Sequence, residues 1–190
     1  MMTKSLAGAL KEWAVVVKAV DEGRQTILIR KGGIQDEGGQ FRVEHRDFVF
    51  YPTFEHQSKD LVTPEAHALF DEVVVGQPPP GRIRFTVMAK VVEVLEARTI
   101  ERLRALADLH IWSPRVIEQR FASGDTAGAL VLVIRAFKLA RPIEAEEQPA
   151  YAGCRSWVTL AAPLSAAGVA PVLPDEAFMR QVETVRARLA

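Results

Sequence analysis

The segment WAVVVKAV at residues 13–20 carries the strongest structural signal in this chain of 190 residues. Its β-branched and aromatic residues, interrupted by a single charge, predict a strand that is buried on both faces. The sequence DEGR at residues 21–24 predicts a turn, because Gly23 adopts a positive φ at little cost. Residues 25–30 predict a second strand, so we expect residues 13–30 to form a β-hairpin.

Both helices and strands are predicted on either side of this hairpin. A short helix is expected at residues 5–12, with Leu6 and Leu10 on one face. A second helix is expected to begin at Thr63, with Pro64 in the first helical position and to run to about residue 72. Further strands are predicted at residues 41–43, 48–51, 82–97, 129–139 and 157–160, and further helices at residues 99–107, 113–121 and from 175 onward. Because this order lacks strict β-α-β alternation, it favours an α+β fold with a mixed, largely antiparallel sheet and flanking helices.

The stretch GQPPPG at residues 76–81 resembles a linker. Consecutive prolines favour an extended, stiff backbone without hydrogen-bond donors. We expect a single α+β domain over residues 1–190, in which this Pro-rich segment joins two candidate lobes at residues 1–75 and 82–190.

The overall composition points to no charged partner. Lys and Arg total 24 and Asp and Glu total 24, so the formal net charge is zero. Residues 81–141 hold eleven basic and six acidic side chains, an excess that fits either a basic face or solvated helix surfaces. A lone Cys154 fits a reducing compartment. Since no signal-peptide core occurs and no apolar run approaches the roughly 20 residues of a membrane helix, we expect a cytoplasmic protein with no membrane partner.

The signature motifs of several common enzyme classes are absent from the sequence. GxGxxG after a strand, GxxxxGK[ST], HExxH and GxSxG do not occur. One cysteine excludes a cysteine-rich zinc site. The sequence therefore leaves open whether the chain is an enzyme, and it assigns no cofactor and no oligomeric state.

Two polar clusters in the first third of the chain are candidates for a site. Arg30 and Lys31 precede Gly32 and Gly33, and backbone amides freed by a glycine turn can form an anion-binding nest to which the cations add charge. Residues 44–57 hold two histidines, three carboxylates and an arginine, and such groups bind divalent metals or exchange protons. The metal candidates are His45, Asp47, Glu55 and His56. A strand-ending turn and loop-backbone hydrogen bonds are the structural alternatives.

The same clusters carry a family resemblance. KEW at residues 11–13, LIRKGGI at 28–34 and FYPTFEHQ at 50–57 resemble domain-of-unknown-function family 1802, a bacterial and archaeal group. Trp112, Arg135 and GCRSW at residues 153–157 are similar to the continuation of that family. The resemblance covers most of the chain and implies a small, usually stand-alone protein without an assigned activity. It therefore transfers no catalytic residue.

Three functional hypotheses follow. The leading one is a module that binds a phosphate-bearing ligand, either a nucleotide or a nucleic acid. Its anion-holding residues are Arg30, Lys31, Gly32 and Gly33, and the residues that contact the rest of the ligand are His45, Arg46, Glu55, His56 and Gln57. The alternatives are a metal-dependent hydrolase or nuclease, and a structural or partner-binding protein without catalysis. The leading hypothesis requires the glycine-paired cations and the histidine-bearing loop to meet around one cavity.

Overall fold

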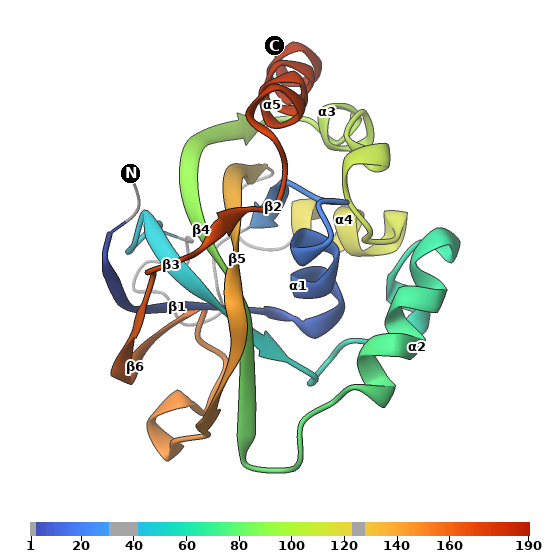
Figure 1. Cartoon of the computed structure of the whole chain (residues 1–190). Coiled ribbons are helices and arrows are strands. Elements are labelled where there is room, and N and C mark those ends of the chain that lie inside the picture. The colour runs from blue at the N-terminus through green and yellow to red at the C-terminus, as the bar shows by residue number, and fades with distance from the viewer. Residues whose placement is uncertain (1–2, 31–41, 123–127) are drawn as a thin grey trace.

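The computed structural model describes residues 3–30, 42–122 and 128–190 (Figure 1). Within these residues, seven strands form one mixed, mostly antiparallel sheet, and five α-helices flank it, which confirms the predicted α+β class. The strands are β1 (Ser5–Trp13), β2 (Ile27–Arg30), β3 (Asp47–Thr53), β4 (Arg82–Ala97), β5 (Ala129–Glu146), β6 (Trp157–Ser165) and β7 (Ala170–Pro171). The helices are α1 (Ala14–Asp21), α2 (His67–Val75), α3 (Ile100–Arg104), α4 (Pro114–Ala122) and α5 (Asp175–Leu189).

The strands follow the order β2-β5-β4-β3-β1-β6, and β7 pairs with β5. β1 runs parallel to β3, with Trp13 opposite Thr53, and antiparallel to β6. The long strands β4 and β5 pair from Arg82 opposite Glu146 to Ala97 opposite Ala129. β4 therefore pairs with β3, which precedes the Pro-rich segment 76–81 in the sequence, and with β5, which follows it.

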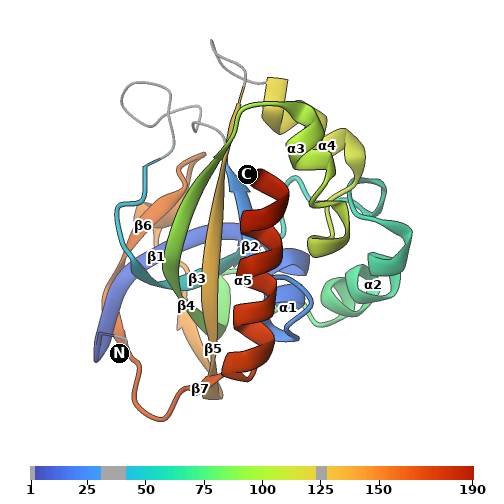
Figure 2. The ribbon, with the colours of Figure 1, turned by 90° about the horizontal axis from the view of Figure 1, so that it is seen from above.

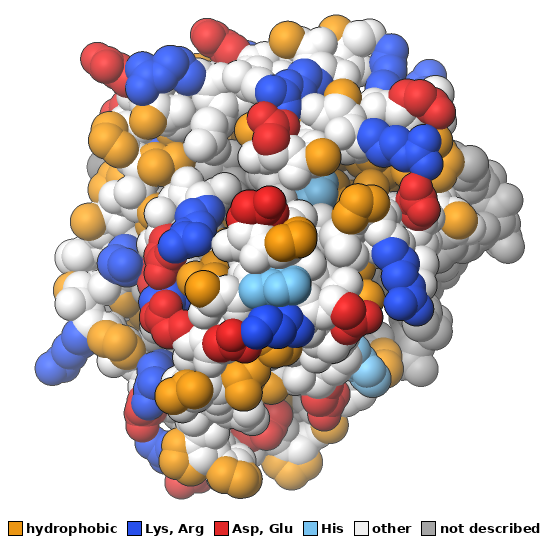
Figure 3. Space-filling model, turned by 90° about the vertical axis from the view of Figure 1, so that its right-hand side faces the viewer, with side chains coloured by type: hydrophobic (Ala, Val, Ile, Leu, Met, Phe, Trp, Pro, Cys, Tyr) orange, Lys and Arg blue, Asp and Glu red, His pale blue; other side chains and the backbone are white. Residues whose placement is uncertain are grey.

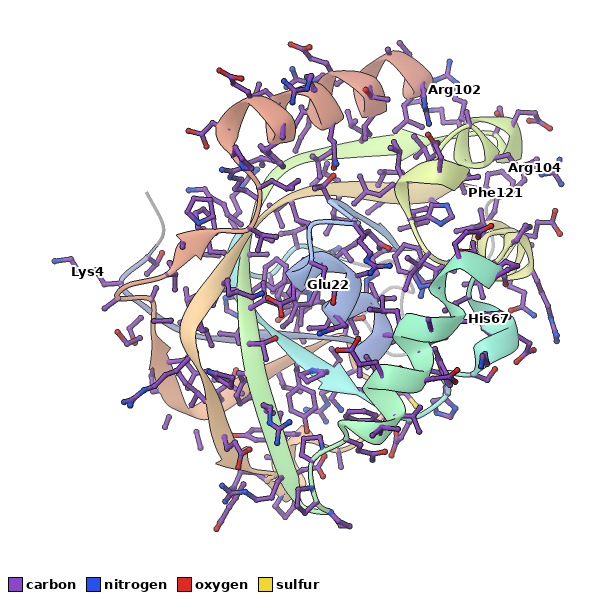
Figure 4. All side chains as sticks on the ribbon, turned by 45° about the vertical axis from the view of Figure 1, so that its right-hand side comes forward. Lys4, Glu22, His67, Arg102, Arg104 and Phe121 are labelled. Atoms are coloured by element: carbon purple, nitrogen blue, oxygen red, sulfur yellow. The ribbon has the colours of Figure 1, made fainter. Side chains whose placement is uncertain are left out.

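The sheet curls strongly around α1. Arg30 at the end of β2 donates a hydrogen bond to the Lys11 carbonyl of β1 at 2.8 Å, although three strands separate β1 from β2 in the sheet order. The apolar side chains of α1 are buried on every side of the helix. Figures 2 and 4 show α1, which Glu22 directly follows, between the strands and the outer helix α2.

Apolar side chains fill both faces of the sheet. The larger core surrounds α1 and includes Trp112 and the inward face of α5, which presents Phe178, Val182, Val185 and Leu189 at helical spacing. A smaller core on the other face contains Tyr51 and Phe85. The sheet thus lies between two apolar layers.

The expected hairpin at residues 13–30 is wrong. Residues 14–21 form α1, and residues 5–12, expected to be helical, belong to β1. An eight-residue apolar run that is buried all round shows no periodicity, so it cannot distinguish a strand from a short helix. Leu6 and Leu10 are four residues apart, a spacing that suggests one helix face, but in β1 the register shifts between Leu6 and Gly8, and the two side chains lie in different cores. β2 pairs with β5 instead.

Most other elements appear where the sequence predicts them. β4 coincides with the predicted strand at residues 82–97, and β5 and β6 begin at the predicted residues but extend further. Residues 42–43 form no strand, and residue 41 lies outside the described part. Among the described residues, no helix is both long and apolar enough to cross a membrane.

Candidate functional site

A buried carboxylate between two arginines marks the most unusual polar site in the fold. The side chain of Glu12, at the end of β1, is 2% exposed. Its Oε2 lies 2.8 Å from Nη2 of Arg30, and its Oε1 lies 3.9 Å from Nη2 of Arg120 in α4. We call Glu12, Trp13, Arg30, Trp112 and Arg120 the Glu12 cluster.

β1 and β3 run parallel, so both strands end on the same side of the sheet. The Glu12 cluster lies where these two strands end. The Thr53 hydroxyl donates to the Glu12 carbonyl at 3.3 Å. The Gln57 side-chain Oε1 accepts from the backbone N–H of Val15 at 3.2 Å, in the first turn of α1. The loop that follows β3 is therefore attached to the start of α1, beside Glu12.

Arg120 is held between two indole rings. Its guanidinium carbon lies 4.3 Å from the centre of the Trp112 ring and 5.7 Å from that of Trp13. Its Nη1 donates to the Ile29 carbonyl at 2.7 Å. Burial lowers the pKa of Arg120 to about 10, and the charge of Glu12 opposes that shift. Arg120 is therefore a cation at neutral pH, with geometry fixed by aromatic and backbone contacts.

A buried histidine lies behind this arginine. His110 is 6% exposed, and its ring centre is 5.5 Å from that of Trp112. Desolvation first, and the charge of Arg120 second, lower the pKa of His110 to about 4. Neither ring nitrogen has a hydrogen-bond partner among the described residues. At neutral pH the imidazole is therefore uncharged and adds nothing to the charge of the cluster.

The structure brings part of the predicted site together. Arg30 is a member of the Glu12 cluster, and Gln57 lies at its edge. Glu55 and His56 are exposed in the same loop, where His56 has a left-handed φ of 61°. A non-glycine residue rarely adopts this conformation. Lys31, Gly32 and Gly33 lie outside the described residues.

The remaining predicted residues lie at the opposite end of β3. The His45 ring packs edge-on against Trp157, with ring centres 5.4 Å apart. Asp47 accepts hydrogen bonds from the backbone N–H and the hydroxyl of Thr3 at 2.9 and 2.7 Å. The Arg46 carbonyl accepts from the N–H of Val91 at 2.7 Å. These contacts are structural and local to that end of the strand.

The four metal candidates are consequently not assembled. His45 and Asp47 lie at the start of β3, whereas Glu55 and His56 follow its end. A strand of this length spans about 20 Å. No group of three or more His, Cys, Asp or Glu side chains is positioned to hold a metal ion in the described ranges.

The basic excess of residues 81–141 does not form one charged face. These side chains are distributed over β4, α3, α4 and β5 and pair with acidic neighbours, as in Arg84–Glu144, Lys90–Asp47, Arg104–Glu118, Arg135–Asp175 and Lys138–Asp21. On the face that bears α2, basic and acidic side chains are interspersed (Figure 3). Arg120 is the member of this segment that joins the Glu12 cluster.

A surface groove of about 630 Å³ lies at the other end of α1. Its charged lining is internally paired: Lys138 lies 3.3 Å from Asp21, and Arg24 lies 2.8 Å from Glu22. The remaining lining comes from β5 and the β7 region. The groove therefore has the size of a small-molecule site, but its charges are balanced and the predicted residues are absent from it.

The sequence alone assigns no role to Glu12, although KEW at residues 11–13 carries part of the family resemblance, and it does not point to Arg120. More than a hundred residues separate them, so no local pattern links them. One signal was available in principle: Lys11 and Glu12 stand between Leu10 and Trp13 in an otherwise apolar stretch, and a carboxylate at a buried position requires a cationic or hydrogen-bonding partner.

Comparison with known proteins confirms the family resemblance. The family model described as "Domain of unknown function (DUF1802)" matches residues 9–184. No curated protein matches the chain. Among solved structures, the chain is similar to the ASCH protein from Zymomonas mobilis, with 12% identity, a TM-score of 0.45 and coverage of 93% of each chain. A mutant of that protein matches with 13% identity, a TM-score of 0.43 and coverage of 93% of this chain and 94% of that chain.

Proposed function

Because the chain belongs to the DUF1802 family, whose description assigns no activity, we propose from the site itself that it binds a phosphate-bearing ligand, a nucleotide or nucleic acid, at the Glu12 cluster. The observation that carries this proposal is the meeting of two guanidinium groups at the end of β1. Arg30 from β2 and Arg120 from α4 both face the Glu12 carboxylate.

The partial burial of the two guanidinium groups strengthens their attraction for an anion. The Arg30 side chain is 14% exposed and that of Arg120 is 20% exposed. Water screens a partly buried charge less than a surface charge, so its attraction for an anion is larger. A guanidinium also offers parallel N–H donors that match the oxygens of a phosphate group.

The surrounding backbone supports an anion at this position. α1 begins at Ala14, beside Glu12, and the N-terminal end of a helix carries partial positive charge. In the sequence, Lys31 and two glycines follow Arg30 directly. All these features favour a ligand with concentrated negative charge.

A binding experiment with matched variants tests the proposal. Calorimetric titration with ATP, pyrophosphate and a single-stranded octanucleotide at low salt should give salt-dependent binding. Arg30→Gln removes one of the two guanidinium groups, so affinity should fall at least tenfold, and the salt dependence of octanucleotide binding should weaken by about one phosphate contact. Arg98→Gln is the control, because Arg98 is 81% exposed and pairs only locally with Glu96.

Two results would count against the proposal. One is the absence of binding to all three probes at low salt. The other is equal affinity of wild type and Arg30→Gln, with thermal unfolding showing that the variant is folded. Arg30→Lys separates the two contributions, because it keeps the charge and removes the two-pronged donor geometry.

A further inference from the structure

The groove at the C-terminal end of α1 holds a carboxylate in an unfavourable position. Asp21 is the last residue of α1, and Glu22, which directly follows it, marks this end of the helix in Figure 4. The C-terminal end of a helix carries partial negative charge, so it repels a carboxylate. The Asp21 side chain is also only 11% exposed. An asparagine would avoid both costs, so the charge of Asp21 requires another explanation.

The hydrogen-bonding capacity of this carboxylate is not fully used. Its Oδ1 is buried and accepts no hydrogen bond from any described residue. The Lys138 ammonium of β5 lies 3.3 Å from Oδ1, in ion-pair contact without hydrogen-bond geometry. Burial raises the pKa of Asp21 above its ordinary value, and the charge of Lys138 opposes that shift. A buried acceptor without a donor costs free energy, which a better-placed donor would recover.

Lys138 is the cation that a ligand can replace. Its side chain is 53% exposed and ends a flexible four-carbon stem, so its ammonium group can move into water. An ion pair whose ammonium group is this exposed is weak. The other nearby cation, Lys18, contacts Glu22 at 3.1 Å and Glu72 at 2.8 Å. Displacing Lys138 therefore opens Asp21 without freeing a second cation to take its place.

The rest of the groove suits a hydrocarbon group. Its volume of about 630 Å³ lies within the range of small-molecule sites. Arg24, the remaining cation of the lining, is paired with Glu22 at 2.8 Å. The uncharged lining residues have no polar side-chain atoms: Leu139, Ala140, Gly168, Ala170, Pro171 and Val172. The groove therefore combines one carboxylate that lacks a hydrogen-bond donor with an apolar wall.

We propose that this groove binds a small primary amine, whose ammonium group replaces that of Lys138 at Asp21 and whose hydrocarbon part lies along the apolar wall. Lys138 is itself a primary ammonium on an alkyl stem, so the same chemistry already occupies the carboxylate. A free ammonium offers three N–H donors and approaches Oδ1 without the constraint of an anchored stem. The groove and the Glu12 cluster lie at opposite ends of α1, so this proposal is independent of the proposed function.

Three probes with one hydrocarbon chain and different head groups test the proposal. Pentylamine, pentanol and pentanoate are titrated into isotope-labelled protein, and binding is followed by the amide chemical shifts. We expect pentylamine to bind about ten- to a hundredfold more tightly than pentanol, because a hydrogen bond between charged groups is stronger. Pentanoate should bind most weakly. The shifts should centre on Gly168 and Ala170, which line the groove.

Two variants assign the ammonium group to Asp21. Asp21→Asn keeps the shape of the side chain and removes its charge, so pentylamine and pentanol should bind with similar affinity. Lys138→Met keeps an unbranched stem and removes the competing ammonium, so affinity for pentylamine should rise about two- to fivefold. Asp71→Asn is the control, because Asp71 is 59% exposed, pairs with Lys59 and lies outside the groove. Its affinities should equal those of the wild type.

Any of four results would overturn the proposal. They are no binding of pentylamine to the wild type, equal wild-type affinity for pentylamine and pentanol, a retained preference for pentylamine in folded Asp21→Asn, and unchanged or lower affinity in Lys138→Met. Thermal unfolding shows whether Asp21→Asn is folded, and if it is not, the comparison of the wild type with Lys138→Met decides. None of these results bears on Arg30 and Arg120, because the probes carry no phosphate.

Discussion

The Arg30 guanidinium joins the edge strand β2 to β1 by binding both the Glu12 carboxylate and the Lys11 carbonyl, each at 2.8 Å. These contacts bring together strands that three others separate in the sheet order. Arg30 thus maintains the curl of the sheet and also contributes a guanidinium group to the candidate site. Stability and ligand binding therefore depend on the same side chain.

Glu12→Gln should destabilise the fold strongly. The carboxylate compensates two partly buried cations, and removing one member of a buried ion pair costs about 3–5 kcal/mol. We expect a decrease of that size in the free energy of unfolding, measured by urea denaturation. Glu96→Gln is the control, since Glu96 is 62% exposed in its pair with Arg98, and its effect should stay within about 0.5 kcal/mol. Similar values for both variants would contradict the buried role of Glu12.

His110 should make stability depend on pH in a defined window. The unfolded chain takes up a proton near the ordinary pKa of 6.5, whereas the folded chain does so only near a pKa of about 4. Between these values the unfolded state binds more protons, so stability is complete above pH 6.5 and falls as the pH decreases to 4. The loss from this group approaches about 3 kcal/mol.

His110→Phe checks this assignment, because it keeps a ring against Trp112 and removes the titration. Urea denaturation of both proteins between pH 4 and 7 should give a shallower pH dependence for the variant. Parallel curves would show that other groups cause the loss of stability.

Gly8→Ala should destabilise the chain through His45. A Cβ atom at Gly8 would lie 2.3 Å from Cδ2 of His45, a distance that forces the imidazole away from Trp157. Such overpacking costs about 1–3 kcal/mol. In a double-mutant cycle, the Gly8→Ala penalty should become smaller when His45→Ala is also present. Additive effects would show that the two residues do not interact.

Tyr51→Phe should remove a buried hydrogen bond to a charged acceptor. Tyr51 is 3% exposed, and its hydroxyl donates to Glu147 Oε1 at 2.8 Å. Burial and this bond raise the pKa of Tyr51 above its ordinary value, so the phenol is protonated throughout the neutral range. We expect thermal and urea unfolding to show a loss of about 1–3 kcal/mol that is constant between pH 6 and 9. A smaller loss in Glu147→Gln, which keeps an acceptor, would support this explanation, and an unchanged stability of Tyr51→Phe would refute it.

The sequence predicted elements best where a clear period was present. β4 shows this, because Ile83, Phe85 and Val87 alternate with polar residues, and the predicted bounds match the strand. α5 shows the same for helical spacing. α1 was mistaken for a strand because its apolar residues surround the helix, and burial on every side leaves no polar face to reveal the period.

The candidate site was only partly predictable, since it joins residues that are distant in the chain. Arg30 and Gln57 come from stretches singled out in the sequence, and both contact the β1–α1 junction. His45 belongs to the same stretch as His56, but the length of β3 places it at the other end of the strand. Arg120 reaches Glu12 only because α4 packs against the curled sheet, and that packing is a tertiary feature without a local pattern.

The position of β1 in the sheet affects how the chain is made. β1 lies between β3 and β6, and Leu10 pairs with Phe50 on one side and with Trp157 on the other. During translation, β1 can therefore complete its pairing only after β6 has left the ribosome. Until then its edge presents unpaired backbone groups to other nascent chains. A message truncated before β6 would thus yield an aggregation-prone product even though the Glu12 cluster is fully encoded.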